Sequence, residues 1–91
     1  MNPAQTSLLG SVEIAMLLPI LNAALGEARR ASGYRLVLDC RGVEDFTSEA
    51  LAELAQTRRR MRQYGADVTL SSCSDWVRSR MIHPMFEALC A

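Results

Sequence analysis

The chain has 91 residues, with ten acidic and ten basic side chains, and every basic residue is an arginine. This length predicts a single domain over residues 1–91 with one hydrophobic core. Because the charges cancel, no net field draws a polyanion to the surface, which argues against nucleic acid or an anionic membrane as the partner.

Three cysteines, Cys40, Cys73 and Cys90, are an odd number without Cys-x-x-Cys spacing. This pattern is typical of a reducing compartment and does not indicate zinc. The apolar stretch from Ile14 to Leu25 resembles the core of a signal peptide, but no Lys or Arg precedes it. It is also shorter than the ~20 residues that cross a bilayer. We therefore expect a cytoplasmic protein that uses no metal and no cofactor.

The first elements are a strand and a helix. A short strand is predicted over Gln5–Leu9, ended by Gly10. A helix is predicted from Leu17 to Ala31, because small and apolar residues recur there at three- and four-residue spacing. Pro19 is compatible with this helix if it lies in the first turn.

A second strand and helix follow. The segment Tyr34–Asp39 has a continuous apolar centre, which is typical of a strand inside a parallel sheet. A turn through Arg41-Gly42 leads to a helix predicted from about Ser48 to Tyr64, with the hydroxyl of Thr47 or Ser48 at its start. Gly65 ends it.

The third strand is predicted over Ala66–Leu70, and Ser72–Asp75 offers caps for a short helix that holds Trp76–Met81. Pro84 interrupts that pattern, so Met85–Cys90 is predicted as a separate short helix. Alternating strands and helices need crossover connections between parallel strands. The predicted fold class is therefore α/β, with a small sheet of three or four mostly parallel strands and helices mainly on one face.

The segment Leu36–Leu51 resembles the signature of STAS domains, the family of anti-sigma factor antagonists. That signature is an apolar strand, an Asp, a Gly-Val turn, and then Asp-Ser-Ser/Thr-Gly-Leu at the start of a helix. Gly65–Leu70 and Ser74–Arg78 resemble the strand and helix that follow in the family, and Leu9–Ile14 resembles the motif before its first helix. The resemblance covers nearly the whole chain and implies a STAS-like fold.

The chain departs from the family in two places. Thr47 and Glu49-Ala50 replace residues of the signature, and only Ser48 falls on the position that family members phosphorylate. The first strand of the family's initial hairpin is missing. We therefore expect an exposed sheet edge near Gln5–Leu9 that is open to self-association or to a partner strand.

The resemblance implies a regulatory protein-binding module whose partner is an anti-sigma factor or a serine-kinase-like regulatory protein. Partner binding would use the start of the second helix, at Asp45, Phe46, Thr47, Ser48 and Glu49. Phosphorylation of Ser48 would place charge at the contact and release the partner. The alternative is that Thr47 and Ser48 only cap the helix, and Glu49 would repel a phosphate beside it.

Two other functions stay open. STAS-like domains also attach to membrane transporters, so the chain could be a constitutive subunit of a lipid or anion transporter. Cys40, followed by Arg41 and Gly42 at a strand end, also suggests the hypothesis of a rhodanese-like sulfurtransferase that uses Cys40. Glu44 and Asp45 would raise rather than lower the pKa of such a thiol. We therefore expect no enzyme and no catalytic residue.

The remaining polar and apolar features have ordinary explanations. The run Arg58–Arg62 is predicted to be a solvated helix face. His83 has no acidic residue at ligand or triad spacing. Four large residues near the end are expected in the core rather than on a partner surface: Trp76, Met81, Met85 and Phe86.

Overall fold

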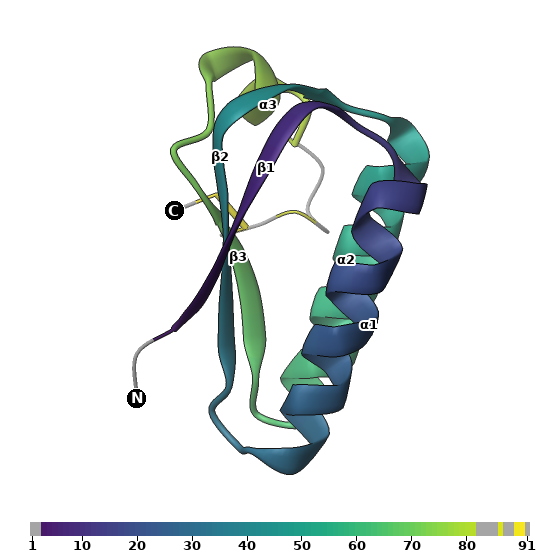
Figure 1. Cartoon of the computed structure of the whole chain (residues 1–91), viewed down its shortest axis with the longest axis vertical. Coiled ribbons are helices and arrows are strands. Elements are labelled where there is room, and N and C mark those ends of the chain that lie inside the picture. Colours follow the sequence, from purple (N-terminus) through teal and green to yellow (C-terminus); the bar gives the residue numbers. More distant parts are fainter. Residues whose placement is uncertain (1–2, 82–85, 87–88, 91) are drawn as a thin grey trace.

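A computed structural model describes residues 3–81, 86, 89 and 90. Three strands form one parallel sheet in the order β1-β2-β3, and the helices α1 and α2 lie side by side on one face of it (Figure 1). This arrangement confirms the predicted α/β class. The elements are β1 (Ala4–Val12), α1 (Ile14–Arg30), β2 (Arg35–Phe46), α2 (Ser48–Gln63), β3 (Asp67–Ser71) and α3 (Asp75–Ser79).

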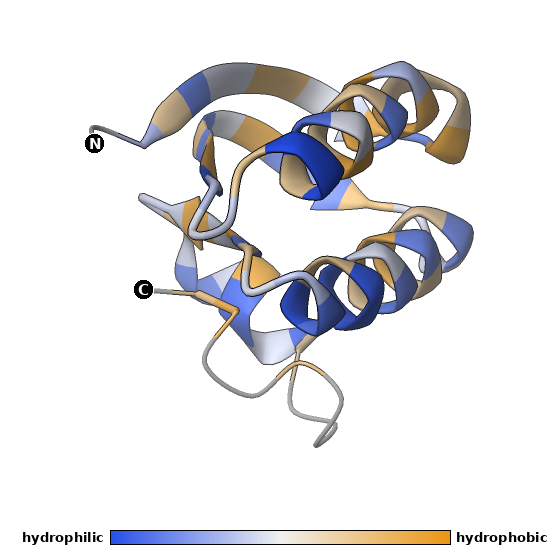
Figure 2. Cartoon of the chain, turned by 90° about the horizontal axis from the view of Figure 1, so that it is seen from below, coloured by the Kyte–Doolittle hydropathy of each residue, from blue (hydrophilic) through white to orange (hydrophobic). Residues whose placement is uncertain are grey.

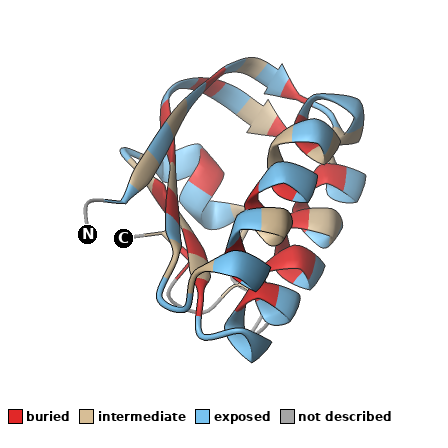
Figure 3. Ribbon diagram, turned by 60° about the horizontal axis from the view of Figure 1, so that its bottom comes forward, coloured by how far each residue is buried: buried red, intermediate tan, exposed pale blue. Residues whose placement is uncertain are grey.

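The core lies between the sheet and the two long helices. Alternate residues of the strands face the helices, so that the period-two pattern of a strand meets the three-and-four spacing of a helix. Figure 3 shows the buried residues on the inner sides of α1 and α2, and Figure 2 shows hydrophilic residues along the outer side of α2. The largest fully buried side chains are Phe46, Leu17, Leu21, Leu38, Leu54, Met61, Leu70 and Leu89.

Helix α1 begins earlier than predicted. It starts at Ile14 rather than Leu17, so Pro19 lies inside the helix and not in its first turn. Proline has no N–H to donate to the carbonyl four residues earlier, that of Ala15. Both Pro19 and Ala15 are exposed, so solvent has access to this part of the helix, which continues through the proline.

Strand β2 is longer than predicted and includes Arg41-Gly42, which the sequence indicated as a turn. Between the pairs Ala4–Leu36 and Val12–Phe46, β2 uses two more residues than β1. Such extra residues form bulges, which bend a strand without ending it. Both strands accordingly curve toward the helices at their carboxyl ends (Figure 1).

Two glycines permit this bend. Gly10, the predicted end of the first strand, instead lies inside β1 at a register shift, with a φ of 69° that favours glycine. Gly42 pairs with Leu9, and a Cβ atom at Gly42 would collide with the Leu9 side chain. Glycine here marks close approach and bending rather than the end of a strand.

The arginine run of α2 is not a uniformly solvated face, which corrects the prediction. Arg58 is only 5% exposed, and its Nε donates a hydrogen bond to Asp67 Oδ1 at 2.9 Å. Arg62 Nη2 lies 3.6 Å from Asp67 Oδ2. Burial by itself would raise the pKa of Asp67, but the hydrogen bond and charge of Arg58, together with the Val68 N–H and the charge of Arg62, lower that pKa. The pair ties α2 to the start of β3.

Helix α3 begins with the predicted kind of cap. The Ser74 side chain accepts a hydrogen bond from the backbone N–H of Val77 at 3.2 Å. Val77 is buried, whereas Trp76 is 57% exposed, which corrects the expectation that Trp76 belongs to the core. A five-residue helix buries only one narrow side, so its other side chains face solvent.

The final segment lies beside β3. The backbone N–H of Leu70 donates to the carbonyl of Leu89 at 2.8 Å, and Cys90 forms an isolated parallel bridge with Leu70. His83, Met85 and two further residues of the helix predicted over residues 85–90, Glu87 and Ala88, lie outside the described residues. Among the described helices, none has the length and apolar character needed to cross a membrane.

The ion pair between Arg58 and Asp67 predicts a pH-dependent stability. Asp67→Asn keeps the shape and the acceptor oxygen but removes the charge that balances a buried guanidinium. We expect the free energy of unfolding at pH 7 to fall by about 2 kcal/mol, below the value for a fully buried pair because Asp67 is 22% exposed. Denaturant unfolding followed by circular dichroism measures this change.

The sign of the pH effect follows from the lowered pKa of Asp67. Its contribution is complete above the unfolded-state pKa of about 4 and is lost as the pH falls through the lower folded-state value. The parent and the variant should therefore converge in stability toward pH 3. Glu44→Gln, which neutralises an exposed carboxylate, is the matched control and should differ little from the parent at either pH. A constant gap between parent and Asp67→Asn would contradict this assignment.

Candidate functional site

The start of α2 is fixed by its connection to β1 and β2. The backbone N–H of Thr47 donates to the carbonyl of Val12 at 3.0 Å, just after β2 ends at Phe46. Thr47 has extended backbone angles, and its Oγ1 accepts the N–H of Ala50 at 3.2 Å. Thr47 is therefore the N-cap of α2. We call Asp45, Phe46, Thr47, Ser48 and Glu49 the helix-start surface.

Ser48 is the first residue of the helix and is exposed. No hydrogen bond within the described part of the chain engages its hydroxyl, because Thr47 already serves as the cap. Of the two hydroxyl residues that could have capped the helix, only Thr47 does so. The Ser48 hydroxyl lies at the positive end of a 16-residue helix.

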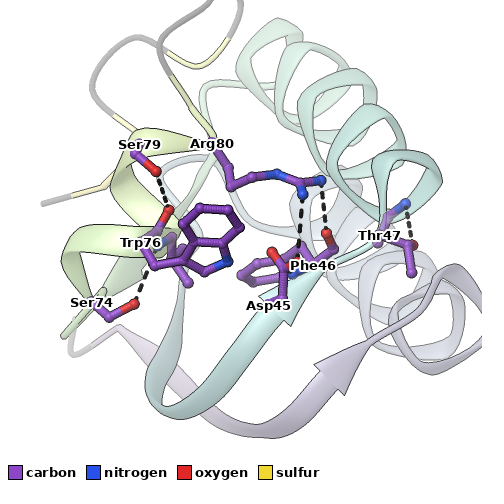
Figure 4. Close-up of polar contacts among 9 residues, drawn as sticks. Asp45, Phe46, Thr47, Ser74, Trp76, Ser79 and Arg80 are labelled. Carbon is purple, nitrogen blue, oxygen red and sulfur yellow. Dashed lines mark hydrogen bonds and ion pairs between the residues drawn. The ribbon is translucent and has the colours of Figure 1, made fainter.

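Asp45 and Arg80 join the helix-start surface to α3. Arg80 Nη1 lies 3.4 Å from Asp45 Oδ2, and Arg80 Nη2 donates to the carbonyl of Phe46 at 3.1 Å. Asp45 Oδ1 accepts the backbone N–H of Phe46 at 2.8 Å. Figure 4 shows this network, in which one guanidinium from α3 holds both the side chain and the main chain at the end of β2.

The ring of Phe46 is buried, with 2% exposure. This corrects the expectation that Phe46 contacts a partner, since its side chain instead packs in the core and anchors the turn into α2. The accessible members are Ser48 and Glu49, which are exposed, and Asp45 and Thr47, which are half-buried.

Trp76 adds a large apolar side chain beside this surface. It precedes Arg80 by four residues, and residues at that spacing share one side of a helix. The backbone N–H of Arg80 donates to the Trp76 carbonyl at 3.3 Å, so the spacing is helical here. Since Arg80 contacts Asp45 and Phe46, Trp76 also lies toward the end of β2 (Figure 4). An exposed indole beside polar groups is typical of a protein contact.

The helix-start surface and its neighbours from the last helix present hydroxyl, carboxylate and guanidinium groups beside an exposed indole ring. Within the described ranges, no group of three or more His, Cys, Asp or Glu side chains is placed to hold a metal ion. Two open cavities, of about 280 Å³ and about 290 Å³, are lined in part by residues of β1. Neither includes a residue of the helix-start surface.

Cys40 lies in the middle of β2 and not at the mouth of a loop. It is 1% exposed, and its Sγ donates to the carbonyl of Leu38 at 3.6 Å. Burial raises the pKa of Cys40 to about 11, so the group is a thiol at neutral pH. Because β2 continues through Arg41-Gly42, the anion-binding loop that a persulfide site needs is not formed at this cysteine.

Two residues of the site were not placed there by the predictions from sequence. Trp76 and Arg80 reach the helix-start surface from α3, about 30 residues further along the chain. The helical spacing of four between them was visible, but it does not say which element they pack against. The pairing of Arg80 with Asp45 follows from the packing of α3 on β2, which no local pattern encodes.

A scan against protein-family models gives no match, and a search of curated proteins gives none either. The similarity to STAS domains therefore rests on the residues quoted above.

The environment of Cys40 predicts slow alkylation. With the reduced chain at pH 7.5, iodoacetamide should modify Cys40 at least about 100-fold more slowly than in the same chain unfolded in urea, because the folded thiol is buried and its pKa is about 11. Peptide mass spectrometry after timed quenching measures the rate. Fast and selective modification of Cys40, with sulfurtransferase turnover, would contradict this reading and support the enzyme alternative.

Proposed function

We propose that the chain is a cytoplasmic regulatory module that binds a protein partner through Trp76 and the accessible members of the helix-start surface, Asp45, Thr47, Ser48 and Glu49. By its resemblance to STAS domains, the partner is an anti-sigma factor or a serine-kinase-like regulatory protein. Phosphorylation of Ser48 is the proposed switch. One observation carries the proposal: at the start of α2, Thr47 caps the helix and Ser48 does not. Among the described residues, the exposed Ser48 hydroxyl has no hydrogen-bond partner.

A rigid surface supports binding because little freedom is lost on association. Three contacts restrain the helix-start surface: Thr47 to Val12, Arg80 to Asp45, and Arg80 to the Phe46 carbonyl. The exposed Trp76 side chain supplies apolar area that a partner can bury. Its neighbours are polar, as expected around the centre of an interface.

A phosphate on Ser48 would have opposite effects on folding and on binding. At the N-terminus of α2 it gains from the helix dipole, and the Glu49 side chain next to it partly offsets this gain. In a docked complex the same phosphate would have to lose its water or meet a cation. The guanidinium of Arg80, which lies at this surface, is already held by Asp45 and the Phe46 carbonyl. Release of the partner without unfolding is the expected result.

The proposal predicts different effects for three variants. Ser48→Ala and Ser48→Asp should both unfold within about 0.5 kcal/mol of the parent, because Ser48 does not cap α2. Thr47→Ala, the control for capping, should lose about 1 kcal/mol. For a partner captured with the parent chain, Ser48→Asp should weaken binding about 100-fold, and Ser48→Ala should keep it.

Trp76 provides the readout for this experiment. It is the single tryptophan of the chain, so its fluorescence should shift to shorter wavelength when a partner covers it. Incubation with the captured kinase and ATP should add one phosphate to the parent and none to Ser48→Ala, as measured by intact mass. Equal affinity of the Ala and Asp variants would overturn the switch. If that equal affinity is for a membrane transporter, the constitutive-subunit alternative is supported instead.

We also propose that the edge of β1 mediates weak self-association. Within the described residues, β1 pairs with β2 on one side and with no strand on the other. Register shifts after Ser7 and Gly10 interrupt the strand, so the regular edge is the segment 4–7. Bulges protect an edge against pairing, which limits the contact to a short stretch.

Sedimentation equilibrium over a range of concentrations tests this association. Gln5→Lys places like charges close together when two copies of this edge pair, and it should weaken the dimer about tenfold. Gln63→Lys adds the same charge at the exposed end of α2 and should leave the dimer unchanged. A parent chain that stays monomeric at high concentration would remove the proposal.

A further inference from the structure

Four sulfur atoms from separate parts of the chain meet beside the sheet, although the sequence shows no cysteine motif. Cys90 Sγ lies 3.0 Å from Cys73 Sγ and 3.5 Å from Met81 Sδ. Cys40 lies near enough to Cys73 for the two thiols to influence each other's pKa. We call Cys40, Cys73, Met81 and Cys90 the sulfur cluster. All three cysteines are free thiols.

Two of the thiols donate hydrogen bonds in different directions. The Cys90 thiol donates to Cys73 Sγ, and the Cys40 thiol donates to the Leu38 carbonyl. Cys40 is buried, whereas Cys73 and Cys90 are half-buried and can meet a small reagent. The accessible thiols of the sulfur cluster are therefore Cys73 and Cys90.

Cys73 is placed to react first and Cys90 to react second. The pKa of Cys73 is raised, first by burial and also by Cys40, although the hydrogen bond from Cys90 and the positive charge of Arg78 act in the opposite direction. Burial and its contact with Cys73 raise the pKa of Cys90 to about 12, so of the two accessible thiols Cys73 is the one whose thiolate has groups that favour it. The Cys90 sulfur is already against the Cys73 sulfur, and a disulfide bond of about 2.05 Å requires only a further ~1 Å of approach.

We propose that Cys73 and Cys90 are a redox modification site, which a low-molecular-weight disulfide such as oxidised glutathione converts into an intramolecular disulfide. The bond would fasten the segment at Cys90 to the loop after β3. Disulfides of cytoplasmic proteins are characteristically transient and regulatory, and these thiols lie in a protein whose sequence favours a reducing compartment. The proposal is independent of the phosphorylation switch.

The reaction balances in two exchange steps. The Cys73 thiolate attacks one sulfur of the reagent, which forms a mixed disulfide on Cys73 and expels one reagent thiolate. The Cys90 thiol then loses its proton and attacks Cys73 Sγ, which breaks the mixed disulfide and expels the second reagent thiolate. The two protons from the protein thiols go to the two expelled thiolates. The cysteine pair is oxidised by two electrons and the reagent disulfide is reduced by two.

The new bond would enclose α3 in a covalent loop. Cys73 directly precedes Ser74, the N-cap of α3. Met81 directly follows Arg80, the C-cap of α3. Cys90 contacts both ends of that segment, through Cys73 and Met81. Cross-linking a loop of this length removes entropy from the unfolded chain, and we expect the melting temperature to rise by about 10 °C.

The test uses the full chain, reduced and then freed of reductant. Incubation with oxidised glutathione under native conditions should give one product that has lost two hydrogen atoms. Peptide mapping should assign the bond to Cys73 and Cys90, with Cys40 alkylated only after unfolding. In urea, the same treatment should give a mixture of pairings that includes Cys40, because the folded arrangement no longer selects the pair.

Two variants separate the roles. Cys90→Ser should stop at a mixed disulfide and gain the mass of one glutathione on Cys73, whereas Cys40→Ala should still form the Cys73–Cys90 bond at a similar rate. The proposal is overturned if the native parent gives the urea mixture, a Cys40–Cys73 bond or a lasting glutathione adduct. A disulfide form that melts below the reduced form would also overturn it. The parent measurement decides the matter even if a variant fails to fold.

Discussion

The bend of β2 is the constraint on which the rest of the molecule depends. β2 pairs with β1 on one side and β3 on the other, so every layer of the fold is positioned by it. Its first part buries Leu36, Leu38 and Cys40 at every second residue, and its last part buries Val43 and Phe46 at every third. The change of period is possible because the two extra residues are absorbed as bulges against β1. An unbulged strand would put Val43 on the face opposite Leu36, Leu38 and Cys40.

The bend also decides which hydroxyl is available at the start of α2. Because β2 curves toward the helices, the Phe46 ring enters the core and the next residue, Thr47, bonds to the Val12 carbonyl at the end of β1. That bond fixes Thr47 in an extended conformation, from which its side chain reaches Ala50. Ser48 then takes the first helical position and points its hydroxyl away from any cap role. The chemical difference between two adjacent hydroxyl residues thus follows from the path of a strand.

The sequence predicted those features that depend on local pattern. The apolar centre of β2, the segment of β3 and the long second helix follow from periodicity, and the Ser74 cap follows from residue type. The strand ends could not be predicted, because Gly10 and Gly42 carry the usual signals of a turn. Their role as bend positions depends on the register between β1 and β2, which is a contact between distant residues.

The site was predictable only in part for the same reason. Its position along the chain followed from a signature resemblance, and the spacing of hydroxyl residues indicated a helix start. Phe46 was predicted at the partner surface and Trp76 in the core, but Phe46 is buried and Trp76 is exposed. Burial of Arg58 against Asp67 likewise reverses the usual preference of arginine for solvent. The burial of each of these side chains depends on which elements pack together, and a local sequence pattern does not determine tertiary packing.

Helix α3 illustrates how such tertiary contacts replace local stability. Five residues are too few for a helix to be stable alone, since nucleation costs more than one turn of hydrogen bonds returns. Its position is held instead by the buried Val77, by Arg80 on the end of β2, and by the sulfur contacts at its two flanks. Trp76 lies between those three attachments, so they set the direction in which its exposed ring faces. The sheet and the final segment therefore act on the proposed contact surface through the same short helix.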